Sequence, residues 1–189
     1  LIDDFSVYGQ NSCVFAPEKL ECRGVDDVVA LIKCWCTAAG VAIGEQGFSA
    51  EQLHSLMGTC KHLKGAYKQF PRRHAHEAFC VIAVFNPTTG GTEYYEAPAL
   101  AFGARNCVYG FNYFARALDW ILTLGLGVAS VHYFDDYPHI EVESTAQDGR
   151  SATEELMNIL GWRFKADGAK ALPFSEVFTT LGAVIDLRG

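Results

Sequence analysis

Apolar residues recur three and four residues apart in three segments of the chain, and this spacing predicts amphipathic α-helices. Glycines follow these segments and are natural helix ends. A capping-box pattern, with Ser three positions before Glu or Gln, opens the last of them and also opens a fourth, shorter segment. Helices are therefore predicted over residues 25–36, 49–57, 108–122 and 151–160.

Shorter apolar runs predict strands that pair as hairpins. Residues 79–85 form a compact apolar run, the turn-forming sequence Asn-Pro-Thr-Thr-Gly-Gly follows, and residues 92–96 can return as the partner strand. A second strand is predicted over 128–134, and residues 139–143 alternate apolar and polar side chains as its partner would. Short terminal strands are expected after residue 162. This order predicts an α+β fold, with an antiparallel sheet covered by helices.

The composition is that of an ordinary globular protein, with 50% apolar and 20% charged residues among 189. No apolar run reaches the roughly 18 residues that a membrane span needs, and the acidic start Leu-Ile-Asp-Asp is unlike a secretory signal. The seven cysteines do not space like a disulfide scaffold or a paired zinc site. We therefore expect reduced thiols in an intracellular protein of the cytoplasm or nucleus, without membrane contact.

The formal net charge of −7 argues against a broad basic surface for nucleic acid. Positive charge is instead concentrated in one stretch that contains no acidic residue before Glu77. The stretch is either a solvated basic loop or a set of phosphate contacts, and the sequence leaves both open. Its basic residues are Lys61, Lys64, Lys68, Arg72 and Arg73.

Three acidic doublets occur, at residues 3–4, 26–27 and 135–136. Only the third, Asp135 with Asp136, is expected at the tip of a hairpin. Adjacent carboxylates held in that way offer the hard oxygen ligands that Mg²⁺ prefers. Phosphoryl transfer commonly uses two such ions, which stabilise the attacking and leaving oxygens. The alternative for the doublet is a solvated turn.

The chain around this doublet resembles the reverse-transcriptase (RNA-directed DNA polymerase) family, and in particular polymerases of retrotransposons. Five blocks occur in the family's order and together cover nearly the whole chain. The family's motifs include Tyr-x-Asp-Asp, Asp-Leu-Lys-x-Ala-Tyr-x-Gln and Phe-Leu-Gly. The blocks here are Leu-Lys-Gly-Ala-Tyr-Lys-Gln at 63–69, Phe-Gly-Ala-Arg-Asn-Cys-Val at 102–108, Tyr-Phe-Asp-Asp at 133–136, Leu-Gly-Trp at 160–162 and Phe-Thr-Thr-Leu-Gly at 178–182.

The resemblance implies a polymerase palm with part of the fingers. Residues 1–59 would be partial fingers and residues 60–189 the palm, without a thumb, and the missing initial Met also suggests a fragment. The implied partners are an RNA template, a DNA primer and deoxynucleoside triphosphates. The implied cofactor is Mg²⁺ or Mn²⁺.

The resemblance also assigns roles by position. Asp135 and Asp136 would be the metal ligands and catalytic carboxylates, and Lys170, with Lys165 as an equal rival, would protonate the pyrophosphate. The remaining assignments are Tyr67 against the sugar, Phe102 and Gly103 at the nucleotide and template, Lys64 and Arg72 at phosphates, and Leu181 and Gly182 in the primer grip.

One position departs from the family, because His62 stands where an aspartate bridges both metals. A ring nitrogen offers one lone pair and no negative charge, and Mg²⁺ disfavours nitrogen. Removing one bridging carboxylate should cost several kcal/mol of transition-state stabilisation, or about a thousandfold in rate. We therefore expect this chain to be weak or inactive with Mg²⁺, unless the local alignment is shifted.

Three alternatives remain open beside polymerisation. The chain can be a catalytically silent remnant of a retroelement that only binds nucleic acid, with the same fold. It can also be a zinc-binding module that uses two pairs of ligands, because zinc accepts both sulfur and nitrogen. Those pairs are Cys60 with His62 and His74 with His76.

A third alternative is a cysteine-nucleophile enzyme. Cys107 is expected at the start of a helix, where the helix dipole favours a thiolate. His132 or His139 would then act as its base. Nothing in the sequence ties these residues together.

Overall fold

The computed structural model describes residues 5–7, 9–15, 18–41, 55–166 and 171–188. Its described residues form a mixed α/β structure with three α-helices and three small antiparallel sheets of two strands each. The chain divides into two compact units, each assembled from two separate stretches. Unit 1 comprises Leu1–Leu20 with Gly65–Tyr113, and unit 2 comprises Glu21–Lys64 with Phe114–Gly189.

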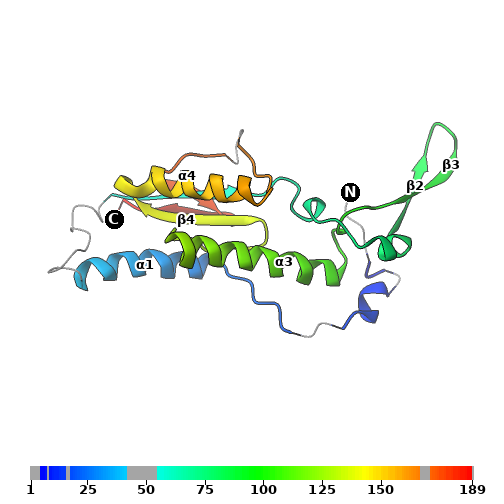
Figure 1. Ribbon diagram of the computed structural model, residues 1–189, viewed down its shortest axis with the longest axis horizontal. Coiled ribbons are helices and arrows are strands. Elements are labelled where there is room, and N and C mark those ends of the chain that lie inside the picture. The colour runs from blue at the N-terminus through cyan, green and yellow to red at the C-terminus, as the bar shows by residue number, and fades with distance from the viewer. Residues whose placement is uncertain (1–4, 8, 16–17, 42–54, 167–170, 189) are drawn as a thin grey trace. The chain divides into compact units, whose positions relative to one another are not determined.

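Unit 2 is built around the antiparallel strands β1 (Leu56–His62) and β4 (Asp136–Val142). In Figure 1, β4 lies between the helices α1 (Val25–Val41) and α4 (Glu143–Ile159). The register places His62, the last residue of β1, opposite Asp136, the first residue of β4. This pairing joins two segments that are far apart in the sequence.

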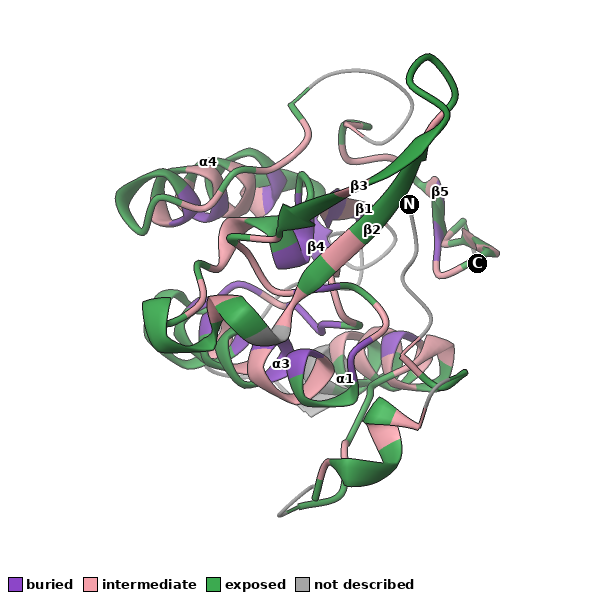
Figure 2. Cartoon of the chain, turned by 90° about the vertical axis from the view of Figure 1, so that its right-hand side faces the viewer, coloured by how far each residue is buried: buried purple, intermediate pink, exposed green. Residues whose placement is uncertain are grey.

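One face of the β1–β4 sheet packs against α1 and forms the apolar core of unit 2. Trp35 of α1 donates a hydrogen bond from Nε1 to the carbonyl of Ile140 at 2.9 Å. Each fully buried aliphatic side chain contributes about 1.5–3 kcal/mol. In Figure 2, buried residues gather on β4 and on the inner sides of the helices. The buried members of this core are Val28, Leu56, Val131, Ile140, Val142 and Phe178.

The opposite face of the sheet is buried but polar. Because side chains alternate along a strand, Tyr137, His139 and Glu141 point away from the α1 face. Glu141 accepts a hydrogen bond from Thr145 of α4 at 2.9 Å, and Lys61 of β1 donates a hydrogen bond to Glu154 of the same helix. Buried polar groups of this kind need such partners to offset their lost hydration.

Unit 1 contains the predicted hairpin, formed by β2 (Val81–Asn86) and β3 (Gly91–Glu96), which confirms the expectation from 79–85 and 92–96. Figure 2 shows that this hairpin is largely exposed. Short 3₁₀ helices complete the unit, and α3 (Arg105–Trp120) begins in unit 1 and ends in unit 2. The 3₁₀ helices are η1 (Gln10–Cys13), η2 (Ala66–Gln69) and η3 (His74–Phe79).

The helices α1, α3 and α4 lie where helices were predicted, but α4 begins at Glu143 instead of Ser151. Ser151 therefore lies inside the helix and is not its cap. The first turns of α4 were not predicted because they form a polar run that contains Gly149. The helix continues through that glycine because Ala146, Thr153 and Met157 are buried along it. A mid-helix glycine costs only about 1 kcal/mol, which this burial offsets.

The end of α4 follows the prediction at Gly161, which has φ 75°. Its N–H donates to the carbonyl of Asn158 at 3.1 Å, and the N–H of Trp162 donates to Met157 at 2.7 Å. These two bonds form a Schellman motif, which satisfies carbonyls left open at the helix end.

The prediction of a helix over 49–57 is wrong where it can be checked. Residues 49–54 lie outside the described residues, and Leu56 and Met57 belong to β1. The strand was not predicted because Thr59 and Lys61 are polar although they are buried. The usual alternation of apolar and polar residues is therefore absent.

The second predicted hairpin is present in a reduced form. The segment 128–134 is not a continuous strand, but it runs antiparallel to β4 through isolated bridges from Ser130 to His139 and from Tyr133 to Asp136. At the C-terminal end, β5 (Val177–Thr180) and β6 (Ala183–Asp186) pair as the expected short strands. Residues 162–164 contribute a single bridge, between Leu63 and Phe164.

Candidate functional site

The tight turn before β4 holds the acidic doublet in place. The N–H of Tyr133 donates to the carbonyl of Asp136 at 2.8 Å, and the N–H of Asp136 returns a bond to Tyr133 at 3.0 Å. Phe134 has φ 53°, in the left-handed region that side chains rarely adopt. The N–H of Leu63 donates to the carbonyl of Asp135 at 2.9 Å, which fixes the turn beside the end of β1.

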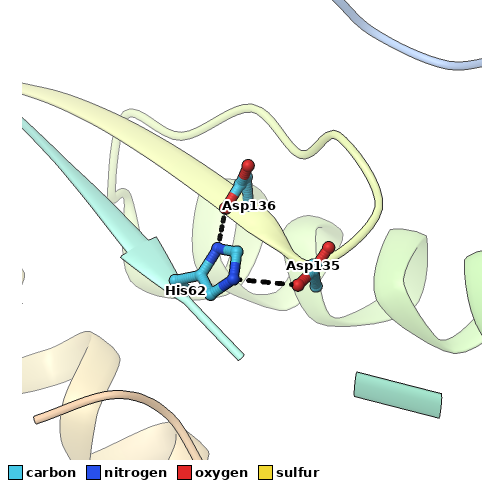
Figure 3. Close-up of side chains that lie close together, drawn as sticks. All are labelled: His62, Asp135 and Asp136. Carbon is cyan, nitrogen blue, oxygen red and sulfur yellow. Dashed lines mark hydrogen bonds and ion pairs between the residues drawn. The ribbon is translucent and has the colours of Figure 1, made fainter. Parts of the chain in front are cut away.

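His62 lies between the two carboxylates of this turn (Figure 3). Its Nε2 is 3.1 Å from Oδ2 of Asp135, and its Nδ1 contacts Oδ1 of Asp136. Only the protonated imidazolium has a hydrogen on both ring nitrogens, so a neutral ring can donate to just one of the two carboxylates. The ring thus occupies the space between two adjacent acidic groups.

The cluster is accessible to ligands. The side chain of His62 is 12% exposed, and those of Asp135 and Asp136 are 32% and 26% exposed. A cavity of about 740 Å³ in unit 2 is lined by His62 and Asp136 together with Leu181 and Gly182. The structure therefore brings the segment that resembles the primer grip to the same cavity as two members of the cluster.

Leu181 and Gly182 form the turn between β5 and β6, with φ 50° and 78°. Two consecutive left-handed residues are typical of a type I′ hairpin turn, whose twist suits antiparallel strands. The hairpin is attached to β1 through Gly58 and Ser175, which exchange backbone hydrogen bonds of 2.9 and 3.0 Å. This attachment explains why the turn reaches the His62 cavity.

Of the two lysines proposed for pyrophosphate protonation, the structure describes only one. Lys170 lies outside the described residues. Lys165 lies beside the cluster, because its backbone N–H donates to the carbonyl of His62 at 2.8 Å. Lys64 is exposed in unit 2, and its backbone N–H donates to the carbonyl of Arg163 at 2.8 Å.

Four of the predicted nucleotide and template residues belong to unit 1, where they make local contacts. The Tyr67 ring is buried, stacked on Phe111 at 4.6 Å and edge-on to Phe102 at 5.3 Å. Gly103 has φ 104°, and its carbonyl accepts a hydrogen bond from Asn11 at 3.0 Å. The guanidinium of Arg72 donates to the carbonyl of Ala97. Each residue thus has a structural role within unit 1, and its role in binding stays a prediction.

Lys61 does not belong to an exposed basic stretch. Its side chain is 3% exposed, pairs with Glu154 and lies with Nζ 5.3 Å from the ring centre of Phe164. The pKa of Glu154 is lowered, because its bonds and ion pairs with Lys61 and Arg150 outweigh the opposing effect of burial. Sequence reasoning missed this pair, since Glu154 is 93 positions away from Lys61 and the two meet only in the folded chain.

The zinc module proposed from Cys60, His62, His74 and His76 stays a prediction, because Cys60 and His62 belong to unit 2 and His74 and His76 to unit 1 of the described part of the chain. There, the one group of three or more His, Cys, Asp or Glu residues that could hold a metal ion is His62, Asp135 and Asp136. Their donor atoms all lie within 4.8 Å of one another. Cys60, the neighbour of these residues in unit 2, does not join that group.

The cysteine-nucleophile alternative finds no support either. Burial raises the pKa of the Cys107 thiol, which disfavours the thiolate. His132 is buried with Nδ1 3.2 Å from Oδ2 of Asp119, and burial, with a smaller contribution from Lys61, lowers the pKa of His139 to about 3. Both histidines are therefore buried residues in the interior of unit 2.

The donor atoms of the cluster do not fit the two Mg²⁺ ions that the resemblance implies. Mg²⁺ requires near-octahedral oxygen coordination, and a pair of ions needs a carboxylate that bridges them. The third position here is an imidazole, whose two nitrogens each face a carboxylate oxygen. One ring nitrogen cannot replace a bridging carboxylate, because it has a single lone pair and no charge when neutral.

Comparison with known proteins does not assign the chain to a family. The sequence matches no protein-family model and no curated protein. Among the helices that the structure describes, none combines the length and apolar character needed to cross a bilayer. Function must therefore be inferred from the His62 cluster, its cavity and the motifs around them.

Proposed function

We propose that the chain is the palm, with part of the fingers, of a reverse-transcriptase-like RNA-directed DNA polymerase whose nucleotidyl transfer is strongly attenuated. The supporting observation is the pairing of His62 with Asp136 across β1 and β4, although 74 positions separate them. The start of the segment that resembles the first palm motif thus adjoins the Tyr-Phe-Asp-Asp turn. Polymerisation requires these two elements side by side.

The attenuation follows from the chemistry of the cluster. A polymerase of this family would present three carboxylates here, whereas this chain presents two carboxylates and an imidazole. In the structure each carboxylate already contacts a nitrogen of His62, so one oxygen of each is engaged within the protein. Loss of one carboxylate at such a centre costs on the order of a thousandfold in rate.

The cavity supports the assignment in a second way. Leu181 and Gly182, the turn between β5 and β6, line it together with His62 and Asp136. In the family that this chain resembles, the corresponding segment holds the primer end beside the carboxylates. A hairpin turn attached to β1 can hold a bound strand at a fixed distance from Asp136.

The second candidate function is a catalytically silent palm that only binds nucleic acid. It is favoured by the same His62 contacts, because a ring held between both carboxylates obstructs the place where two bridged Mg²⁺ ions would act. The two candidates share the fold and differ only in whether a primer is extended at all.

Extension of a labelled DNA primer on an RNA template, in the longest natural chain that contains these residues, tests the proposal. We expect slow extension with Mg²⁺ or Mn²⁺ that Asp135→Asn abolishes. Asp148→Asn, at an exposed position of α4, is the matched control and should leave extension unchanged. Template–primer binding without extension would favour the silent palm, and extension that survives Asp135→Asn would contradict both.

A further inference from the structure

The His62 cluster carries a donor set that is unusual for a polymerase centre but suited to another class of cation. One imidazole nitrogen and two carboxylate oxygens, from three different residues, lie within 4.8 Å of one another. Zn²⁺ is bound by this combination of histidine and carboxylate ligands, at about 2.0–2.2 Å and in tetrahedral geometry. Ligand atoms in such a site are about 3.4 Å apart, so modest side-chain movements suffice to close the cluster.

From this geometry we infer that His62, Asp135 and Asp136 bind one borderline divalent cation, with Zn²⁺ strongly preferred over Mg²⁺. The preference follows from the ligands, because nitrogen donors suit zinc and other late first-row metals, whereas Mg²⁺ retains oxygen ligands and several waters. The inference goes beyond the proposed polymerase function and does not require that a primer is extended.

The backbone holds the three ligands in position before a cation arrives. His62 and Asp136 are direct partners in the β1–β4 register, and Asp135 is tied to β1 by the bond between its carbonyl and the N–H of Leu63. Neither strand needs to move for the side chains to converge. Ligands that are ordered in advance lose less conformational entropy when they bind.

The imidazole has a second nitrogen that suits a metal ligand. While one ring nitrogen coordinates the cation, the other points away from it and can donate a hydrogen bond. Metal-binding histidines commonly make such a bond, which fixes the tautomer and the orientation of the ring. The cavity beside His62 and Asp136 leaves a further coordination position open to water or to a small ligand.

Titration of the metal-free protein with ZnCl₂ or MgCl₂, followed by calorimetry, tests the inference. We expect the native chain to bind Zn²⁺ at least about 100-fold more tightly than Mg²⁺ at this site. His62→Ala should lower the zinc stoichiometry by one ion per chain. His62→Asp, which supplies a third carboxylate, should weaken zinc binding at least tenfold and strengthen Mg²⁺ binding.

Two control variants separate this site from other zinc ligands of the chain. Cys60→Ser changes a thiol that lines the same cavity, and His74→Ala changes a histidine whose side chain is 96% exposed. Both should leave the His62-dependent zinc ion in place. Far-UV circular dichroism of each variant shows whether the fold is retained, and Asp135→Asn provides a second ligand change if His62→Ala fails to fold.

The inference is overturned if Mg²⁺ binds as tightly as Zn²⁺, or if His62→Ala and Asp135→Asn leave the zinc stoichiometry unchanged. Primer extension has no part in this measurement. A chain that binds zinc through His62 and extends no primer supports the zinc site and contradicts the proposed function. A chain that extends primers but binds no zinc through His62 supports the proposed function and contradicts the zinc site.

Discussion

Gly58 of β1 lies directly against the aromatic ring of Phe178 in β5. A Cβ atom added at Gly58 would overlap three carbons of that ring. Phe178 is buried in the core of unit 2, and its hairpin carries the turn that lines the His62 cavity. The absence of a side chain at one position of β1 thus allows the β5–β6 hairpin to pack beside the candidate site.

Gly58→Ala should destabilise the protein by about 1–3 kcal/mol, because the new methyl group overpacks the core against a rigid ring. In urea unfolding, the double variant with Phe178→Leu should be less destabilised than the sum of the two single variants, by about 1 kcal/mol. Gly110→Ala is the control, since a Cβ there meets nothing within 4 Å, and it should be neutral or stabilising. Additive effects of the two core variants would contradict this contact.

Glu154→Gln should destabilise the protein by about 2 kcal/mol, because it leaves the buried ammonium of Lys61 without its charged partner. The value is below that of a fully buried pair, since Glu154 is 31% exposed. Glu155→Gln changes an exposed neighbour and should alter stability by less than about 0.5 kcal/mol. Adding Lys61→Met to Glu154→Gln should restore much of the lost stability. Equal effects of Glu154→Gln and Glu155→Gln in urea unfolding would contradict a stabilising pair of Lys61 with Glu154.

His139 should make the protein sensitive to acid. Burial, with a smaller contribution from Lys61, lowers its pKa from 6.5 to about 3, and neither ring nitrogen has a hydrogen-bond partner among the described residues. In the unfolded chain, His139 therefore takes up a proton near pH 6.5, whereas in the folded chain it stays neutral until about pH 3. Stability is lost as the pH falls through this window, by up to about 1.4 kcal/mol per pH unit.

His139→Leu removes that proton uptake and should flatten the pH dependence. Between pH 7 and pH 5, the free energy of unfolding of the native chain should fall by about 2 kcal/mol more than that of His139→Leu. His74→Ala, at an exposed position, should follow the native chain. Parallel pH profiles for the native chain and His139→Leu would show that His139 is protonated in the folded protein.

Elements with one apolar face could be predicted from the sequence, and elements with a polar buried face could not. The helix α1 follows its apolar spacing because Val28 and its neighbours pack on the sheet. Strand β1 was missed because Thr59 and Lys61 are buried polar residues whose partners come from elsewhere in the chain. The early start of α4 was missed for a related reason, since its first turns bury little apolar surface.

The candidate site could be predicted only in part. A Tyr-Phe-Asp-Asp sequence after an apolar run indicated that Asp135 and Asp136 lie at a hairpin tip, and the structure places Asp135 in a turn and Asp136 at the start of β4. The position of His62 between both carboxylates depends on the register of β1 and β4, which local patterns do not specify. Lys61, the preceding residue of β1, points to the other face of the sheet, where it is buried against Glu154.

The rate of single-nucleotide incorporation with Mg²⁺, measured for the native chain and for His62→Asp on the same RNA template and DNA primer, tests the central claim most directly. If His62 weakens a polymerase centre, His62→Asp should incorporate at least about a thousandfold faster, and Asp135→Asn should abolish that gain. Equal rates for the two proteins, or no incorporation by His62→Asp while template and primer remain bound, would contradict the account.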